Sequence, residues 1–290
     1  METRDHAAYY HVCTDGNALQ WMFQDKEDFI AGINRIAICV AELKILVLAF
    51  VLMDNHVHFV LWGTLVQCKD FITKYKLLTG RWVSKKYGKM SPVKHLPTQL
   101  ILISGEEQLL DTIAYIDRNA IVAGYRYLPC EYPWGSARFM FRDKVSPTCG
   151  TTKLSDLSET EKQDILKTWA ELPGDWEIDQ NGMILPECFL DISKLEGLFK
   201  SPARYLYYLS KKLEGKVEMQ HGIQAFICDK ELRVIVKDLC LDLFGRQDPD
   251  NLDFNSKLLL ARRLRYNYAS TPKQISRMLN MNVDILTKFI

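Results

Sequence analysis

Two periodicities of apolar side chains alternate along the first half of the chain. Apolar residues recur at the spacing of an amphipathic helix over residues 25–42, 68–87 and 106–121. Short apolar or alternating runs, typical of strands, occupy residues 8–13, 44–53, 56–62 and 99–104. The pattern therefore predicts the order strand, helix, strand, strand, helix, strand, helix.

This order of elements predicts the fold class. Without its last helix it is a split βαβ-βαβ order, which is typical of a ferredoxin-like arrangement with an antiparallel sheet and helices on one face. The turn-forming pair Asp54-Asn55 separates two of the strands, so we expect these strands to form a hairpin. The first half of the chain is therefore predicted to be an α+β domain with a ferredoxin-like antiparallel sheet.

A change of pattern marks the second half of the chain. Residues 141–160 are polar, are interrupted by Pro147 and Gly150, and show no periodicity. We therefore predict one domain over residues 1–145 and a mostly helical region over residues 146–290. Within that region the pattern predicts a hairpin turn at Asn181-Gly182 and helices at residues 159–172, 201–214, 229–244 and 254–268.

Residues 271–290 resemble a helix-turn-helix. Thr271-Pro272 begins a helix, residues 280–282 interrupt it, and a second apolar-periodic segment follows at residues 283–290. In such a motif the second helix enters a groove of DNA. An amphipathic helical pair that caps a bundle explains the same pattern equally well.

His56 and His58 are the first candidates for chemistry. Side chains on a strand alternate between its faces, so both histidines are expected on one face and Val57 and Phe59 on the other. Two neutral imidazoles on one face could bind a single divalent ion. Because two ligands do not complete a metal site, the alternative is one partly buried and one exposed histidine.

The charged residues indicate a local basic surface, whereas the net charge of the whole chain is close to zero. The net charge of +1 gives no overall attraction to polyanions, but basic residues crowd residues 69–94, where Asp70 is the single acid. This bias favours a phosphate-facing surface on helix 68–87, although a solvated basic helix is the alternative. The candidate DNA contacts are Lys74, Arg81, Lys85, Lys86 and Lys89, with Tyr75, Trp82 and Tyr87 as candidate stacking surfaces.

Composition limits the class of protein. A chain of 290 residues with 48% apolar residues can bury substantial cores, so we expect a folded protein. Its eight cysteines are scattered without a Cys-x-x-Cys pair, which is typical of reduced, buried thiols. The N-terminal residues contain no apolar signal core, and no apolar stretch has membrane-spanning length. We therefore expect a cytoplasmic protein without a membrane partner.

The helix at residues 106–121 supplies further candidates. Its apolar stripe leaves Tyr115 and Asn119 on the other side of the helix. Residues four apart share one helix face, so the phenol and amide oxygens could approach the same ion or phosphate. The alternative is an ordinary amphipathic tyrosine, since position alone does not select one of the 13 tyrosines in the chain.

Three groups of residues, taken together, distinguish Tyr115 from the other tyrosines as the candidate for chemistry. They are Met53-x-Asn55-His56-Val57-His58, then Tyr115-Ile116-x-x-Asn119-x-x-x-Ala123-Gly124, then Tyr132-Pro133-Trp134-x-Ser136. With this combination the chain resembles the HUH single-strand tyrosine transposases, and more narrowly the REP-associated tyrosine transposases and their insertion-sequence relatives. The resemblance covers residues 9–139, and the combination is far more specific than any one part.

The resemblance implies metal-dependent cleavage and rejoining of single-stranded DNA. In that family, two histidines and a side-chain oxygen from the tyrosine helix hold a divalent ion against the scissile phosphate, so His56, His58 and Asn119 would be the ligands. Tyr115 would be the nucleophile and would form a 5′-phosphotyrosine link, releasing a 3′-hydroxyl. The implied cofactor is Mg²⁺ or Mn²⁺, and two imidazoles favour the softer ion. The implied partner is single-stranded or hairpin DNA, with a possible homodimer as in some relatives.

The chain departs from the family pattern at two places. Relatives usually have Asn-Pro-Val-Arg-Ala-Gly after the tyrosine, whereas residues 119–124 lack the arginine. Relatives also carry a Gly/Phe/Gln/Arg-rich segment before the fourth strand, which residues 90–98 do not reproduce. Two other functions compete with the transposase: a non-cleaving DNA-binding regulator derived from one, and a hydrolase of a small phosphoester. The hydrolase would need a general base that the motif does not supply.

Overall fold

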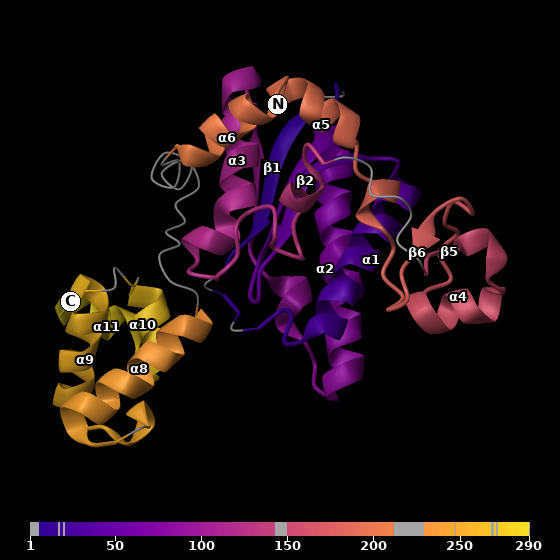
Figure 1. Cartoon of the computed structure of the whole chain (residues 1–290). Helices are drawn as coiled ribbons and strands as arrows, with labels where there is room; N and C mark the ends of the chain where they lie inside the picture. The colour runs from indigo at the N-terminus through magenta and orange to yellow at the C-terminus, as the bar shows by residue number, and fades with distance from the viewer. Residues whose placement is uncertain are drawn as a thin grey trace. The chain divides into compact units, whose positions relative to one another are not determined.

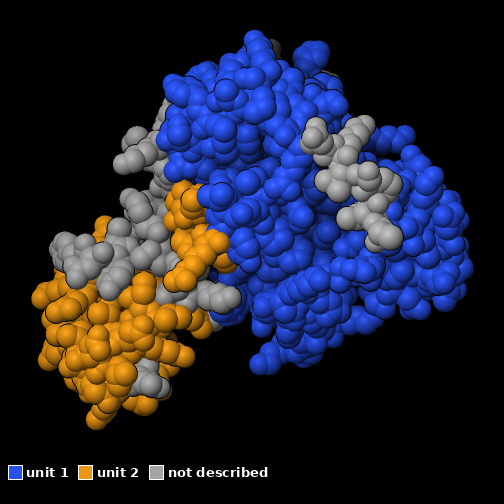
Figure 2. Space-filling model, in the orientation of Figure 1, with its two compact units in different colours: residues 1–119, 127–213 blue, residues 120–126, 214–290 orange. Residues whose placement is uncertain are grey.

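The chain divides into two compact units (Figure 2). The computed structural model describes residues 6–16, 18–19, 21–142, 150–211, 229–246, 248–267, 270 and 272–289. Unit 1 comprises residues 1–119 and 127–213, and unit 2 comprises residues 120–126 and 214–290. All the candidate ligands, the candidate nucleophile and the candidate DNA contacts named above belong to unit 1.

Unit 1 is built on a four-stranded antiparallel sheet (Figure 1). Its strands, in spatial order, are β2 (Leu46–Leu52), β3 (Val57–Gly63), β1 (Ala8–Thr14) and β4 (Thr98–Leu102). β2 and β3 form the predicted hairpin, whose turn is closed by a hydrogen bond of 2.8 Å from Met53 N to His56 O. The predicted α+β class and antiparallel sheet are confirmed.

Helices α1 (Lys26–Leu43) and α2 (Leu65–Tyr87) pack side by side on one face of the sheet (Figure 1). Asp25 caps α1, and Thr64 with Gln67 forms a capping box that starts α2 before residue 68, where it was predicted to begin. Their apolar stripes are buried against β1 and β3. This core includes Val12, Phe29, Ile33, Ile36, Phe59, Phe71 and Tyr75.

Helix α3 (Glu106–Val122) lies against the opposite face, where the ring of Tyr115 meets the ring of His58 on β3. The side of α3 that was expected to lie off the core is also buried: Tyr115 and Asn119 are each 4% exposed. Helix α6 (Pro202–Ser210) covers another side of α3, where the Tyr205 hydroxyl donates to Asp117 Oδ2 at 2.7 Å. The expectation failed because the side that carries Tyr115 and Asn119 faces the histidines at the start of β3.

Residues 150–211 belong to unit 1, so the boundary predicted at residue 145 is wrong. The Asn34 side chain of α1 is hydrogen-bonded at 2.8 Å both to Gly182 O and to Ile184 N, and Leu154 and Phe189 join the core of the sheet. The polar stretch at residues 141–160 is therefore a connection within one unit, because the apolar residues beyond it complete the same core. The elements of this region are β5 (Thr152–Lys153), η3 (Leu154–Asp156), α4 (Glu159–Leu166), β6 (Glu177–Ile178), η4 (Pro186–Cys188), α5 (Ile192–Phe199) and α6.

Two predicted elements of this region end differently. Helix α4 stops at Leu166 rather than at residue 172, because Lys167 takes a left-handed conformation with φ of 54° and its N–H bonds back to Gln163 O. The predicted hairpin turn is present, with Gly182 at φ 77° and Asp179 N donating to Met183 O at 2.9 Å. Helix α6 ends at Ser210, and residues 212–214 of its predicted range lie outside the described residues.

The described part of unit 2 is helical, as predicted. Its elements are α8 (Asp229–Phe244), η5 (Pro249–Asn251), α9 (Phe254–Asn267), α10 (Pro272–Leu279) and α11 (Val283–Phe289). The helices α10 and α11 are joined by residues 280–282, where Asn280 takes φ of 51°, so the predicted helical pair is present. These helices share a core that includes Leu232, Val236, Leu260, Leu264, Ile275, Leu279 and Leu286. No helix in the described parts of the two units has the length and apolar character needed to cross a bilayer.

Candidate functional site

His56 and His58 lie at the start of β3, on the sheet face that α3 covers. His58 is within β3 and is paired with Cys13 of β1, and His56 immediately precedes the strand. The two rings are 4.9 Å apart and nearly perpendicular, at 88°. Val57 and Phe59, which alternate with them, are buried in the core under α1 and α2. Both imidazoles therefore lie on one side of the sheet, as the His-x-His spacing predicts.

Asn55 determines where the His56 ring carries its proton. Asn55 Nδ2 donates to Gly16 O at 2.7 Å, so it is Asn55 Oδ1 that faces His56 Nδ1, also at 2.7 Å. Burial lowers the pKa of His56 to about 4, against the opposing effects of Asn119 and Asp15, so the ring is neutral at pH 7 and carries one N–H. That hydrogen lies on Nδ1, beside the acceptor, and Nε2 carries the lone pair.

Helix α3 brings Tyr115 and Asn119 to these histidines. Asn119 Oδ1 lies 3.4 Å from His56 Nε2, although the two residues are 63 positions apart in the chain. The Tyr115 ring meets the His58 ring edge-on, with centroids 5.6 Å apart at 89°. Tyr115 and Asn119 are each 4% exposed. The predicted nucleophile and the three predicted ligands therefore lie together in one cluster, in which Tyr115, Asn119 and His58 are buried and His56 is partly exposed.

The cluster contains two residues that the sequence analysis did not select, His11 and Cys13 of β1. His11 Nε2 lies 3.0 Å from His58 Nδ1, and the His11 ring is also 6.0 Å from the ring of Tyr115. Ligand atoms of His11, Cys13 and His58 all lie within 4.8 Å of one another. The alternation His11-x-Cys13 is the signal that could have found them, because it places both side chains on one strand face.

Comparisons of the chain with models of protein families, with curated proteins and with solved structures find no match. In the cluster, a neutral imidazole faces an amide oxygen and a buried tyrosine contacts a second imidazole.

The donor atoms of the cluster fit a divalent cation. With the proton on Nδ1, the lone pair of His56 Nε2 and the Asn119 oxygen face each other at 3.4 Å, a separation at which both atoms could bind one cation. In the tautomer in which His58 Nδ1 donates to His11, His58 Nε2 also carries a lone pair. A set of two imidazole nitrogens and one amide oxygen suits Mn²⁺ at least as well as Mg²⁺.

The Cys13 thiol is not ionised in the cluster at neutral pH. Burial raises the pKa of Cys13 to about 12, and the negative charge of Asp15 acts in the same direction. Its sulfur becomes a thiolate ligand only if a metal ion displaces the proton.

The third predicted motif, residues 132–136, is hydrogen-bonded to β2 and to α3. Trp134 O accepts a hydrogen bond of 2.9 Å from Leu52 N, and Ser136 Oγ accepts one of 3.0 Å from Phe50 N. Ser136 Oγ is also 3.1 Å from Asp117 Oδ1 on α3. The motif therefore ties β2 to the helix that carries Tyr115, which is a structural role.

We expect Asp117 to make the stability of the protein depend on pH. Burial raises the pKa of Asp117 to about 7, against the lowering effects of its bonds with Tyr205 and Ser136. Because the unfolded chain ionises this carboxyl near pH 3.9, the free energy of unfolding should fall from about pH 4 to about pH 7, by up to about 4 kcal/mol. Urea unfolding across this range should show the decline in the wild type and not in Asp117→Asn. Equal pH slopes in the two proteins would contradict the assignment.

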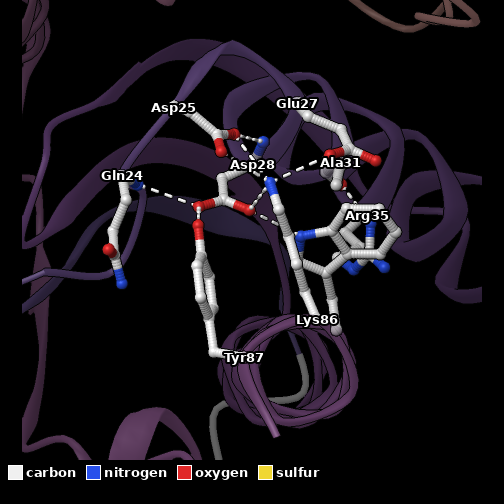
Figure 3. A network of polar contacts seen from close by, with 9 residues as sticks. Gln24, Asp25, Glu27, Asp28, Ala31, Arg35, Lys86 and Tyr87 are labelled. Carbon is white, nitrogen blue, oxygen red and sulfur yellow. Dashed lines mark hydrogen bonds and ion pairs between the residues drawn. The ribbon is translucent and has the colours of Figure 1, made fainter.

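The predicted DNA contacts on α2 fall into two groups. Lys74 forms an ion pair with Glu42, and Lys86 forms ion pairs with Asp25 at 2.7 Å and Asp28 at 3.0 Å (Figure 3). These two lysines are already neutralised by carboxylates. The other three are exposed: Arg81, Lys85 and Lys89.

The predicted stacking role of the α2 aromatic residues is wrong for Tyr75, whose ring is fully buried. Trp82 and Tyr87 are held instead by the buried carboxylate of Asp28, to which they donate hydrogen bonds of 2.9 and 2.6 Å. Burial raises the pKa of Asp28, but the hydrogen bonds, that of Tyr87 first, outweigh it and leave the pKa below its usual value. These rings stabilise the contact between α1 and α2 rather than forming a free surface for bases.

Proposed function

We propose that this protein is a metal-dependent single-stranded DNA transposase that cleaves and rejoins DNA through a 5′-phosphotyrosine link at Tyr115. The observation that carries the proposal is the convergence of Tyr115 and Asn119 of α3 on His58 and His56 at the start of β3. This is the arrangement of residues that the resemblance to the HUH single-strand tyrosine transposases implies.

The architecture of unit 1 supports the same proposal. Its strand order, β2-β3-β1-β4, with α1 between β1 and β2 and α2 between β3 and β4, supports the ferredoxin-like arrangement that the sequence predicts. In this order β1 and β3 are adjacent in the middle of the sheet, so His58 lies on a strand held from both sides. A site on such a strand is positioned more rigidly than one on a loop.

The chain's own residues have separate tasks in the proposed reaction. His56 Nε2, Asn119 Oδ1 and the His58 ring would hold the divalent ion, and Asn55 fixes the His56 tautomer that can do so. Bound there, Mg²⁺ or Mn²⁺ would polarise the scissile phosphate and stabilise the charge that develops on it. The Tyr115 oxygen would attack phosphorus in line with the 3′ oxygen, which leaves as a hydroxyl. Attack by a 3′-hydroxyl on the phosphotyrosine would rejoin the strand.

We propose substrate contacts at those of the predicted basic residues that form none of the ion pairs described above. Arg81, Lys85 and Lys89 are exposed and could contact phosphates of a single strand or hairpin. In unit 2, the pair α10 and α11 could bind DNA as a helix-turn-helix. A homodimer, which some members of the resembled family form, stays a prediction.

The test uses a pool of single strands that carry a hairpin flanked by random sequence, labelled at either end. With Mg²⁺ or Mn²⁺, the 3′ label should become linked to protein on a denaturing gel, while the 5′ label appears in a shorter free strand. His56→Ala should lower the yield at limiting Mn²⁺ by at least about 10- to 100-fold, the range found when only a hydrogen-bond partner of a metal ligand is lost, whereas His95→Ala, at an exposed histidine, should not. A metal-independent adduct, or one that carries the 5′ label, would contradict the proposal.

A second candidate is a DNA-binding regulator that does not cleave. Two observations favour it: Tyr115 is only 4% exposed, and unit 2 presents the helical pair α10 and α11. DNA could reach Tyr115 only after the packing around it opens. Retained hairpin binding without any adduct, with either metal ion, would favour the regulator over the transposase.

A further inference from the structure

The cluster around His58 contains two donor sets of different chemical character. One set consists of His56, Asn119 and His58, with nitrogen and oxygen donors. The other consists of His11, Cys13 and His58, with two imidazole nitrogens and a thiol sulfur within 4.8 Å of one another. All three residues of the second set are buried, at 1%, 0% and 1% exposure. His58 is common to both sets.

We propose that His11, Cys13 and His58 form a second metal site, specific for Zn²⁺ or a similarly thiophilic divalent ion, whose occupation inactivates the first. Two imidazoles and one thiolate form a ligand set typical of zinc, whereas Mg²⁺ prefers oxygen ligands. The existence of this site does not depend on the proposed function, but its inhibitory effect rests on it.

The antiparallel register of β1 and β3 builds this site. Cys13 is paired directly with His58, and His11 lies two residues away on the same strand face. Directly opposed and diagonal side chains of neighbouring strands are within reach of each other. The distance of 3.0 Å between His11 Nε2 and His58 Nδ1 is a few tenths of an ångström shorter than the separation of two nitrogens around one zinc ion, so the rings need to move little.

Zinc in the second site prevents a metal ion from binding in the first, because the His58 ring carries one proton and therefore has only one nitrogen free to act as a ligand. A neutral imidazole has one N–H and one lone pair. When Nδ1 donates to His11, Nε2 is the nitrogen that can bind the catalytic ion. When zinc takes Nδ1, the proton moves to Nε2, which can then no longer act as a ligand. The thiol proton of Cys13 passes to solvent as the zinc–sulfur bond forms.

The zinc site is tested first by spectroscopy on the full chain. Co²⁺ as a probe should give a sulfur-to-cobalt charge-transfer band in the wild type and in Cys39→Ala, a control at another fully buried free cysteine, but not in Cys13→Ala. X-ray absorption of the zinc-loaded wild type should show one sulfur neighbour at about 2.3 Å and nitrogens at about 2.0–2.1 Å. This second measurement decides the matter if Cys13→Ala does not fold. A zinc shell without sulfur, or an unchanged cobalt band in a folded Cys13→Ala, would overturn the site.

The exclusion is tested by Mn²⁺ binding, which needs no cleavage activity. Electron paramagnetic resonance should show that zinc releases bound Mn²⁺ from the wild type and from Cys39→Ala, and that Cys13→Ala requires at least about tenfold more zinc for the same release. Simultaneous binding of both ions to the wild type would overturn the exclusion. Absence of any Mn²⁺ binding would count against the proposed function, whereas the cobalt and zinc spectra would still decide the second site.

Discussion

Tyr115→Phe is expected to abolish the covalent protein–DNA adduct. Phenylalanine keeps the ring that packs edge-on against His58 but lacks the oxygen that would attack phosphorus. Because the reaction would lack its nucleophile, the yield should fall by at least about a thousandfold. The measurement is the amount of 3′-labelled hairpin DNA that stays with the protein on a denaturing gel, at a Mn²⁺ or Mg²⁺ concentration that saturates the wild type.

The matched control for this variant is Tyr132→Phe. Tyr132 is also buried, at 3% exposure, and its hydroxyl donates to Leu52 O at 2.8 Å, so the control removes a buried hydroxyl of equal size. It should lose about 1 kcal/mol of stability and still form the adduct. Tyr115→Phe should bind the hairpin as tightly as the wild type in filter binding. An undiminished adduct in Tyr115→Phe would exclude Tyr115 as the nucleophile.

Asp28→Asn is expected to destabilise unit 1 by about 3–5 kcal/mol, the range found when one partner of a buried charge pair is removed. Asp28 is fully buried and accepts from Gln24 N, Trp82 Nε1, Tyr87 and Lys86 (Figure 3). An asparagine amide presents two hydrogens where the carboxylate presents an acceptor, so at least one of these donors would face another donor. Urea unfolding, followed by tryptophan fluorescence and by circular dichroism, measures the difference.

The control for Asp28→Asn is Asp25→Asn, three residues earlier and bound to the same lysine. Asp25 has a side chain that is 51% exposed, and it caps α1, a role that asparagine also fulfils. Its replacement should therefore cost less than about 1 kcal/mol. Equal effects of the two substitutions would show that Lys86 is held by surface charge in general and that the buried carboxylate has no special role.

Local patterns predicted the elements of the sheet and its helices, because amphipathic periodicity is a property of consecutive residues. The His-x-His spacing placed His56 and His58 on one side for the same reason. His11 and Cys13 were missed because their relation to His58 depends on which strands are neighbours and in what register. A pairing between strands is not encoded in either strand alone.

The remaining errors have the same physical origin. Tyr115 and Asn119 were expected off the core because they lie off the apolar stripe of their helix, and Tyr75 was assigned as a stacking surface because it lies among lysines, yet all three are buried. Asp117 is covered by Tyr205, which belongs to a segment predicted to be a separate region. The polarity of residues 141–160 indicates a loop correctly, but a polar loop can connect two parts of one core as well as two domains.

The hydrogen bonds between residues 134–136 and β2 restrict how copies of this chain could associate. Leu52 and Phe50 on β2 already bond to Trp134 and Ser136, so the main chain at this edge of the sheet is occupied. Exposed edge strands are the usual template on which a second chain adds a strand. Two copies that joined their sheets edge to edge would therefore have to meet at β4, and a dimer of any other kind would have to use side-chain surfaces.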